Sequence, residues 1–329
     1  MMKPINVGTL SISGHFLKRV LPALRKSKIV HAYAIASRDP VKAERFAREL
    51  HIPQHYGSYD SLIYDEAVDI VYLPLPNHLH AEWIRRCADA GKHVICEKPI
   101  ALNAHEAEEA LEYAKQKKIC VMEGFMYKFH PQWARVKELI DAGEIGRLKL
   151  IEVFFGYMNE NPDDIRNQKD AGGGALYDIG CYAVSVARFL TESEPKRVMC
   201  SQVIDPVFFT DAVTNGILDF GDVCATFTVS TKIYQHQRVD IHGEKGMITV
   251  DMPFNAHPDT SERLIIKAED EETIELCGPA DQYMIQFESF AQRMAACCPP
   301  LVPPSDAIAN MHVIDMLFRS AENERWEKV

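Results

Sequence analysis

Residues 68–96 read VDIVYLPLPNHLHAEWIRRCADAGKHVIC, and this stretch decides the fold class. It begins and ends with short apolar runs, Val68–Pro74 and His93–Cys96, which are typical of strands buried on both faces. Between them, His78–Ala90 carries apolar residues at helical spacing. A strand, a helix and a second strand in this order predict a parallel βαβ unit.

The same alternation extends to both sides of this stretch. Further apolar runs fall at Ile5–Leu10, Ile29–Ala36 and Ile119–Met122. Helical patterns fill the gaps, and in one of them Asp39 and Pro40 suit the N-cap and first position of a helix that ends at Leu50. Another helical pattern covers Asn103–Lys117. The fold class expected for the N-terminal half is therefore α/β, a Rossmann doubly wound parallel sheet.

The second half has a different pattern. Helices are expected at Pro131–Ala142, Gly174–Phe189, 282–297 and 305–323. Strands are expected at Leu148–Phe155, Arg197–Val203, Ala212–Phe220, Ala225–Thr231, Gln237–His242 and Met247–Val250. Glycine-containing turns such as Phe220–Asp222 separate some of these strands, which is typical of antiparallel pairs. This pattern predicts a C-terminal α+β domain with a large, mainly antiparallel open sheet.

Length and composition fit two soluble domains. The chain has 329 residues, of which 47% are hydrophobic and 25% charged. We place a dinucleotide-binding domain at residues 1–125 and a substrate-binding and oligomerisation domain at 126–329, with the last helix packing back on the first domain. The net charge of −11 argues against nucleic acid or an anionic membrane as the main partner.

A cytoplasmic location is expected from three features. The longest apolar runs are too short to cross a bilayer, and Met1–Pro4 has no apolar core of a signal peptide. The nine cysteines are scattered without a C-x-x-C pair. We interpret them as reduced thiols, since a disulfide framework would show regular spacing. The adjacent Cys297 and Cys298 are expected at the surface end of a helix.

The first strand is followed by Ser11, Ile12, Ser13 and Gly14, where a Rossmann protein binds the pyrophosphate of its cofactor. The usual G-x-G-x-x-G slots fall on Ser11, Ser13 and Phe16, so serine replaces two glycines. Serine is small and its hydroxyl can donate to phosphate, which keeps cofactor binding open. An ordinary strand-to-helix turn fits this motif equally well.

The end of the second expected strand bears on the choice of cofactor. NAD-specific enzymes usually place a carboxylate there for the ribose 2′-hydroxyl. This chain has Ser37 and Arg38, whose hydroxyl and guanidinium suit a 2′-phosphate. We therefore expect NADP(H) rather than NAD, although an exposed arginine after a strand is also common.

Four further segments carry a resemblance to a known family. They are Leu73–His80, Cys96-Glu97-Lys98-Pro99, Met122–Gln132 and the GGG-x-L-x-D-x-G-x-Y motif of Gly172–Tyr182. In this order and over nearly the whole chain, they resemble the glucose–fructose oxidoreductase/inositol dehydrogenase (GFO/IDH/MocA) family. The most similar branches are the xylose dehydrogenases, the dimeric dihydrodiol dehydrogenases and the sugar ketoreductases.

The resemblance implies roles for individual residues. Lys98 matches a lysine beside the nicotinamide, and its bond to Pro99 is expected to be cis. Tyr182 matches the tyrosine that acts as general acid and base, and Asp178 lies one helical turn earlier, where it would hold a substrate hydroxyl or orient the acid/base pair. The resemblance also implies that six residues line the cofactor near its nicotinamide end: Leu75, Pro76, Asn77, His80, Glu97 and Lys98. His130 and Arg166 are candidates for contact with the substrate.

The chemistry is consistent with these roles. Reduction of a carbonyl requires a proton for the alkoxide that forms as hydride arrives from the cofactor. A nearby ammonium such as that of Lys98 favours the phenolate of Tyr182 and stabilises the alkoxide. The sequence thus predicts an NADP-dependent oxidoreductase that transfers hydride to or from a carbinol carbon of a sugar, keto-sugar or trans-diol.

Two other functions stay open. One is a dinucleotide-binding sensor without turnover, which the degenerate glycine motif allows. The other is a glycosidase of the same family that recycles a tightly bound NAD. No metal site is expected, because His78 and His80 have no third ligand nearby in the sequence. A homodimer or homotetramer through the C-terminal sheet is expected from the resemblance.

Overall fold

A computed structural model describes residues 4–269 and 271–329 of the chain. The start of the chain, which bears on the expected absence of a leader, lies outside the described residues. The structure divides into two compact units. Unit 1 comprises residues 1–125 and 283–308, and unit 2 comprises residues 126–282 and 309–329.

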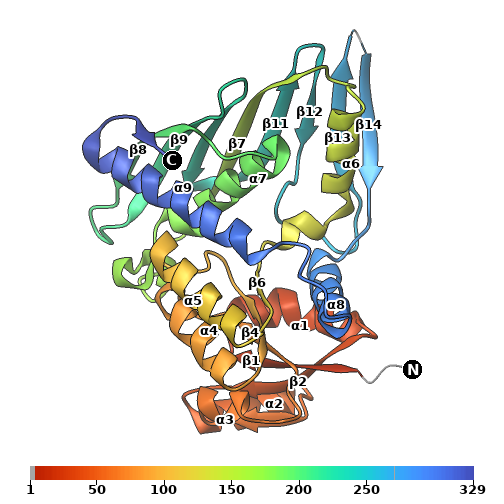
Figure 1. Cartoon of the computed structure of the whole chain (residues 1–329), viewed down its shortest axis with the longest axis vertical. Helices are drawn as coiled ribbons and strands as arrows, with labels where there is room; N and C mark the ends of the chain where they lie inside the picture. Colours follow the sequence, from red (N-terminus) through yellow and green to blue (C-terminus); the bar gives the residue numbers. More distant parts are fainter. Residues whose placement is uncertain (1–3, 270) are drawn as a thin grey trace. The chain divides into compact units, whose positions relative to one another are not determined.

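Unit 1 contains a six-stranded sheet in the order β3-β2-β1-β4-β5-β6, with every neighbouring pair parallel (Figure 1). Its strands are β1 (Ile5–Leu10), β2 (Val30–Ala36), β3 (Gln54–Tyr56), β4 (Ile70–Leu73), β5 (His93–Cys96) and β6 (Val121–Glu123). Its helices include α1 (Leu21–Lys26), α2 (Pro40–Glu49), α3 (Tyr59–Ile63), α4 (His80–Asp89) and α5 (Ala104–Gln116). All four residues of β4 are buried, as expected of a central strand. The predicted doubly wound fold class is confirmed.

Local capping explains where these helices begin. Asp39 Oδ1 accepts a hydrogen bond from the backbone N–H of Lys42 at 3.1 Å, which makes Asp39 the N-cap of α2 with Pro40 in the first helical position. Asn103 caps α5 in the same way, with Oδ1 2.9 Å from the backbone N of Glu106. Both helix starts follow the pattern that the sequence predicts.

Residues 283–308, which the sequence-based boundary assigns to the second domain, group with unit 1. This segment includes most of α8 (Gln282–Ala295). The ring of Phe287 lies edge-on to Tyr72 of β4 at 5.4 Å between centroids, and Tyr283 lies edge-on to His15 at 5.5 Å. Burial of these aromatic rings against the sheet explains why α8 belongs to this unit.

Unit 2 contains a nine-stranded sheet in the order β14-β13-β12-β11-β7-β10-β9-β8-β15. Its strands are β7 (Leu148–Met158), β8 (Arg197–Ile204), β9 (Asp211–Asp219), β10 (Cys224–Ser230), β11 (Lys232–Gly243), β12 (Gly246–Val250), β13 (Glu262–Ala268), β14 (Glu271–Cys277) and β15 (Glu327–Lys328). Within this sheet, the β7–β10 pair is parallel and the other pairs of described strands are antiparallel. The prediction of a large, mainly antiparallel sheet is confirmed, whereas β13 and β14 were not expected from the sequence.

Helices α6 (Pro131–Asp141) and α7 (Cys181–Thr191) lie on one side of this sheet (Figure 1). The sheet turns alternate residues such as Ile151, Val153 and Phe155 toward them, and these side chains are almost fully buried. The core of unit 2 therefore lies between the helices and one face of the sheet. The remaining long helix, α9 (Pro304–Asn323), completes the chain before β15.

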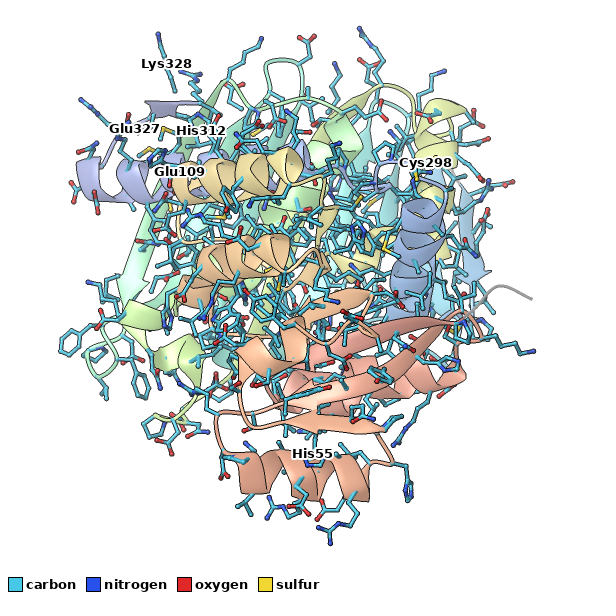
Figure 2. The ribbon with its side chains drawn as sticks, turned by 60° about the horizontal axis from the view of Figure 1, so that its bottom comes forward. His55, Glu109, Cys298, His312, Glu327 and Lys328 are labelled. Atoms are coloured by element: carbon cyan, nitrogen blue, oxygen red, sulfur yellow. The ribbon has the colours of Figure 1, made fainter. Side chains whose placement is uncertain are left out.

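All nine cysteines are free thiols. Cys297 and Cys298 are exposed just beyond the end of α8, and Figure 2 labels Cys298 at the surface. This placement agrees with the expected surface end of a helix. In the described part of the chain, no helix is both long and apolar enough to cross a membrane.

Candidate active site

The turn after β1 has the backbone geometry of a cofactor-binding turn. Ser11 adopts a left-handed conformation with φ of 84°, and its N–H donates to Ala36 O of the neighbouring strand at 3.0 Å. This is the slot of the first glycine in the Rossmann motif, where a left-handed residue is easiest for glycine. Ser11 therefore occupies a glycine conformation at the cost of backbone strain.

This strain leads to a stability prediction. We expect Ser11→Gly to raise the free energy of unfolding of the cofactor-free protein by about 0.5–1 kcal/mol, because relief of a strain of 1–2 kcal/mol exceeds the added entropy of the unfolded chain. Urea denaturation measures the difference. Ser11→Ala is the matched control, since it keeps the strain and removes only the hydroxyl. Equal stabilities of the glycine and alanine variants would show that the turn is not strained.

The helix after this turn departs from the Rossmann pattern. Ser13 Oγ accepts from the backbone N–H of Phe16 at 3.1 Å and so caps the helix. Phe16 occupies the third glycine slot; its side chain is fully buried and its ring lies 6.3 Å from that of Tyr72. Phe16–Val20 form a π-helical turn, which widens the helix where the large ring replaces glycine. No atom lies within 4 Å of a Cβ built on Gly14, so the turn stays open there.

The end of β2 suits a phosphate. Arg38 is exposed, and no hydrogen bond or ion pair of its guanidinium occurs within the described residues. Ser37 is buried, and its Oγ accepts from the N–H of Asp39 at 3.1 Å. Because the carboxylate of Asp39 caps α2, it does not compete for the position that binds a ribose hydroxyl in NAD enzymes. These residues fit a nucleotide with a 2′-phosphate.

The E-K-P turn follows β5, with a cis bond between Lys98 and Pro99 as the resemblance implies. Glu97 Oε1 accepts a hydrogen bond from Tyr72 Oη at 2.6 Å and lies 3.4 Å from His15 Nε2. Burial alone would raise the pKa of Glu97. The charge of His15 and the hydrogen bond from Tyr72 outweigh burial and lower this pKa to about 2. Glu97 is therefore an ionised, half-buried carboxylate directly before Lys98.

His80 supports this turn from behind. Its side chain is completely buried, with Nδ1 2.8 Å from Pro99 O and Nε2 2.9 Å from Leu75 O. Burial lowers the pKa of His80, against the opposing effect of the two carbonyl groups. Since both ring nitrogens are engaged by the backbone, His80 links the E-K-P turn to the segment at Leu75, where the sequence predicts cofactor contacts. The short helix η2 (Asn77–Leu79) continues that segment, with Pro76 as its N-cap.

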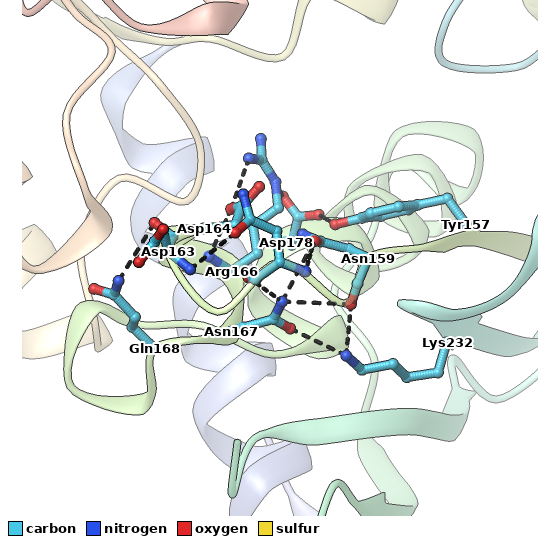
Figure 3. A network of polar contacts seen from close by, with 10 residues as sticks. Tyr157, Asn159, Asp163, Asp164, Arg166, Asn167, Gln168, Asp178 and Lys232 are labelled. Carbon is cyan, nitrogen blue, oxygen red and sulfur yellow. Dashed lines mark hydrogen bonds and ion pairs between the residues drawn. The ribbon is translucent and has the colours of Figure 1, made fainter. Parts of the chain in front are cut away.

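In unit 2, Asp178 lies in a polar network (Figure 3). Its Oδ2 accepts from Tyr157 Oη at 2.5 Å, and its Oδ1 accepts from Arg166 Nε at 3.0 Å. Arg166 Nη1 also donates to Asp164 Oδ1 at 3.3 Å. The charge of Asp178 raises the pKa of Arg166, and burial raises the pKa of Tyr157. The network thus orients Asp178 and shares Arg166 between two carboxylates.

The same network anchors the loop that carries Arg166. Asn167 Nδ2 donates to Asn161 O at 2.8 Å, and Lys232 Nζ of β11 donates to Asn159 O at 2.5 Å (Figure 3). These bonds tie the loop after β7 to the sheet. The position of Arg166 is therefore fixed, and its charge is balanced by neighbouring carboxylates.

Tyr182 lies in the first turn of α7, directly after the π-helical turn η6 (Leu176–Gly180) that contains Asp178. Its ring is buried, with centroids 5.0 Å from Phe254, 5.9 Å from Phe155 and 6.0 Å from Tyr127. Tyr182 Oη donates to the sulfur of Met126 at 3.4 Å, and a thioether is a weak acceptor. π-Turns are frequent at functional sites, and this one brings Asp178 and Tyr182 into one segment.

The triple glycine is required by close packing. Gly174 has φ of 117°, and a Cβ on it would lie 1.9 Å from Asp211 Oδ1. Asp211, at the start of β9, accepts from the N–H of Leu176 at 2.7 Å and from Thr214 Oγ1 at 2.5 Å. Burial raises the pKa of Asp211 to about 6. The triple-glycine segment is therefore packed tightly against the start of β9.

We expect Gly174→Ala to lower the free energy of unfolding by about 3 kcal/mol, because the methyl group meets Asp211 and the backbone conformation disfavours L side chains. Urea denaturation followed by circular dichroism gives the value. The control is Gly14→Ala, where the added methyl group has open space. A Gly174 variant as stable as the Gly14 variant would contradict the close approach of Asp211.

His130 has a structural role at the start of α6. Its Nδ1 accepts from the N–H of Gln132 at 3.3 Å, which caps the helix. The side chain is buried, and burial lowers its pKa to about 4, so the imidazole is neutral near pH 7. His130 is therefore the N-cap of α6, while its contact with a substrate stays a prediction.

Sequence reasoning missed several polar residues of these sites. They are His15, Tyr72, Tyr157 and Asp211. Tyr72 lies in the expected strand Val68–Pro74, whereas Tyr157 lies beyond the end of the expected strand Leu148–Phe155, and their hydroxyl groups were the available signal. A buried tyrosine usually finds a partner for its O–H.

Unit 1 is a parallel sheet with a glycine-like turn at the end of β1 and a phosphate-compatible end of β2. Unit 2 carries a carboxylate network. Together these features define a dinucleotide-dependent oxidoreductase. Residues 7–125 match the oxidoreductase family with an NAD-binding Rossmann fold, and residues 133–249 match the GFO/IDH/MocA C-terminal domain. The chain belongs to the GFO/IDH/MocA family. The resemblance and the oxidoreductase class that the sequence predicts are confirmed.

Individual relatives cover almost the whole chain. An uncharacterised oxidoreductase of Rhizobium meliloti is 36% identical over 98% of each chain. D-xylose 1-dehydrogenase (NADP(+)) 2 of Haloferax volcanii is 36% identical over 96% of this chain and 97% of its own. A 3-ketoreductase from Actinomadura kijaniata, solved with NADP and TDP-benzene, has a TM-score of 0.92 and 28% identity over 97% of this chain and 98% of its own. Its structures include a tyrosine-to-phenylalanine and a lysine-to-alanine variant.

Proposed function

We propose that the protein is an NADP-dependent dehydrogenase or reductase in which Tyr182 is the general acid and base and Lys98 assists it. The observation that carries the proposal is the clamped carboxylate of Asp178 one turn before Tyr182, in a π-turn of the family motif. In the 3-ketoreductase, the tyrosine and the lysine that were replaced are separated along the chain by the same number of residues as Tyr182 and Lys98.

The cofactor is NADP(H). Arg38 and Ser37 would hold the 2′-phosphate, and the turn of Ser11–Gly14 would hold the pyrophosphate through backbone N–H groups. The names of the xylose dehydrogenase and of the 3-ketoreductase structure both include NADP. When bound, the nicotinamide supplies or accepts the hydride.

Residues of the protein donate and accept the proton that accompanies hydride transfer. In reduction, Tyr182 Oη donates its proton to the carbonyl oxygen as the C–H bond forms, and in oxidation the phenolate takes the proton of the alcohol. The ammonium of Lys98 stabilises negative charge on both oxygens. The aromatic rings around Tyr182 exclude water and hold the phenol in one orientation.

We propose a neutral polyhydroxylated substrate, a sugar or keto-sugar, with a trans-diol as the less polar alternative. Asp178 accepts from Tyr157 and Arg166, so its carboxylate is oriented for further hydrogen bonds from a hydroxyl group. Arg166 lies between Asp178 and Asp164, and this arrangement suits a hydroxyl better than an anionic group. His130 is proposed to line the same substrate pocket.

Turnover of NADP(H) with a panel of aldoses, keto-sugars and trans-diols tests this function. Absorbance change at the nicotinamide band with one substrate class, lost in Lys98→Ala, supports the proposal. Release of free NADPH in amounts equal to product separates a dehydrogenase from a glycosidase that recycles its cofactor. Tight NADPH binding without turnover on every panel member would instead favour a sensor.

We also propose that the protein is cytoplasmic and forms a homodimer or homotetramer through the nine-stranded sheet of unit 2. The sheet face opposite α6 and α7 exposes apolar side chains, among them Met158 and Ile217. Light scattering at micromolar concentration measures the assembly state. A monomer would exclude this assembly.

A further inference from the structure

His15 occupies a position to which neither the sequence nor the chemistry above gives a role. It follows the cofactor turn directly, in the first turn of the helix after β1. Its side chain is 29% exposed, and its ring lies edge-on to Tyr283 of α8 at 5.5 Å between centroids. A histidine is the one side chain whose charge ordinarily changes between pH 5 and 8.

The partner of His15 is the carboxylate that precedes the predicted catalytic lysine. His15 Nε2 lies 3.4 Å from Glu97 Oε1, and the Glu97 side chain is 16% exposed. The same oxygen accepts from Tyr72 Oη at 2.6 Å, and the N–H of Glu97 donates to Leu73 O at 3.1 Å. Glu97 is thus held by β4 on one side and by His15 on the other.

Several groups act on this pair. Burial raises the pKa of the Tyr72 hydroxyl and of the Cys96 thiol well above their usual values, so neither adds a charge beside Glu97. The charges of His15 and Lys98 both lower the pKa of Glu97. His15 therefore supplies one of the positive charges beside this carboxylate.

We infer that His15 is a positioning residue of the catalytic turn: its imidazole contacts Glu97 and so fixes the residue directly before Lys98. The part of this inference that concerns Lys98 rests on the proposed function. The link between the cofactor turn and the E-K-P turn is independent of it, because this link is given by the His15–Glu97 and Glu97–Tyr72 contacts. NADPH affinity therefore depends on the contact between His15 and Glu97.

The test is the NADPH dissociation constant, measured by fluorescence at one fixed pH and ionic strength. We expect His15→Gln to weaken binding about tenfold, because glutamine offers no positive charge to Glu97. His15→Lys keeps a cation that can reach Glu97, so it should bind within about twofold of the wild type.

His31→Gln is the matched control. His31 is exposed near the start of β2, at the sheet edge opposite the carboxyl ends that bind cofactor, and this variant should bind like the wild type. A loss in His15→Gln no larger than that in His31→Gln, or a lysine variant that behaves like the glutamine variant, overturns the inference.

A double-mutant cycle tests the partner. Glu97→Gln removes the acceptor, and the His15→Gln/Glu97→Gln double variant should bind NADPH no more weakly than Glu97→Gln alone. Losses that multiply would show that His15 acts independently of Glu97 and would overturn the proposed route. With an active substrate, kcat of His15→Gln should fall while KM for the substrate stays unchanged. The binding measurements need no substrate. The proposed role of His15 can therefore fail while the proposed function holds, and the proposed function can fail while the role of His15 holds.

Discussion

Replacement of Tyr182 by phenylalanine should lower kcat about 10³-fold, within the range of 10²–10⁴ that general acid–base catalysis contributes. The variant loses only the phenolic O–H, while the ring keeps its packing against Phe155 and Phe254. The hydrogen bond to the Met126 sulfur disappears, and because a thioether is a weak acceptor, its loss should change the thermal midpoint little. Steady-state kinetics at the nicotinamide band and NADPH titration measure the two properties.

The chain offers a matched control for this variant. Tyr127 is equally buried, its ring lies 6.0 Å from that of Tyr182, and its Oη is 2.8 Å from Ser185 Oγ. Tyr127→Phe removes the same atom from a neighbouring ring, so it should cost stability of about 1 kcal/mol and leave kcat within about threefold. If Tyr182→Phe keeps more than a third of kcat, another group delivers the proton and the proposed role of Tyr182 is wrong.

Most elements of unit 1 could be predicted from sequence because each signal is local, but the short strand β3 (Gln54–Tyr56) was not expected. The expected strands have continuous apolar runs, and Asp39 and Asn103 carry the capping oxygens where the helices begin. β13 was missed because its apolar run, Leu264–Ile266, is short and lies between charged residues. β14 was missed because it is rich in glutamate and all its side chains are at least partly exposed. Segments of this kind resemble exposed loops in composition.

The contacts within the candidate site are harder to predict from sequence than the helices and strands. Asp178 and Arg166 were both singled out from the sequence, but no pattern predicts that they pair with each other and with Tyr157 of β7. His80 was expected to line the cofactor, and only the fold shows that two backbone carbonyls occupy its ring nitrogens. The same holds for Gly174, whose partner Asp211 lies on another element. Residue identity was predictable at these positions, and the partner was not, because the partners are distant in sequence.

Ser11 and Phe16 show why the glycine motif was a weak signal. The left-handed backbone at Ser11 is the feature that the motif encodes, and it persists without glycine. Phe16 fits the third slot through a π-turn in the helix. A motif defined by residue type fails where the backbone geometry is kept by other means.

Reversal of charge at Arg38 should have the second large effect, on the choice of cofactor. We expect Arg38→Glu to weaken NADPH binding about 10³-fold, because the change removes a charge-assisted contact and places a carboxylate opposite the 2′-phosphate. NADH affinity should change less than about threefold or improve, since a carboxylate at this position can accept from the ribose 2′-hydroxyl. Titration of both dinucleotides at one fixed ionic strength gives the ratio.

Arg48→Glu controls for the change in net charge. Arg48 is exposed near the end of α2, where it pairs with Glu44 at 3.1 Å. Because α2 runs back along the sheet, this end lies away from the carboxyl ends of the strands, and both affinities should stay within about twofold. A loss of NADPH binding in Arg48→Glu that matched the loss in Arg38→Glu would mean that the overall field sets the affinity. A loss confined to Arg38→Glu, with NADH binding kept, places the 2′-phosphate at the end of β2, where Asp39 is committed to its helix cap.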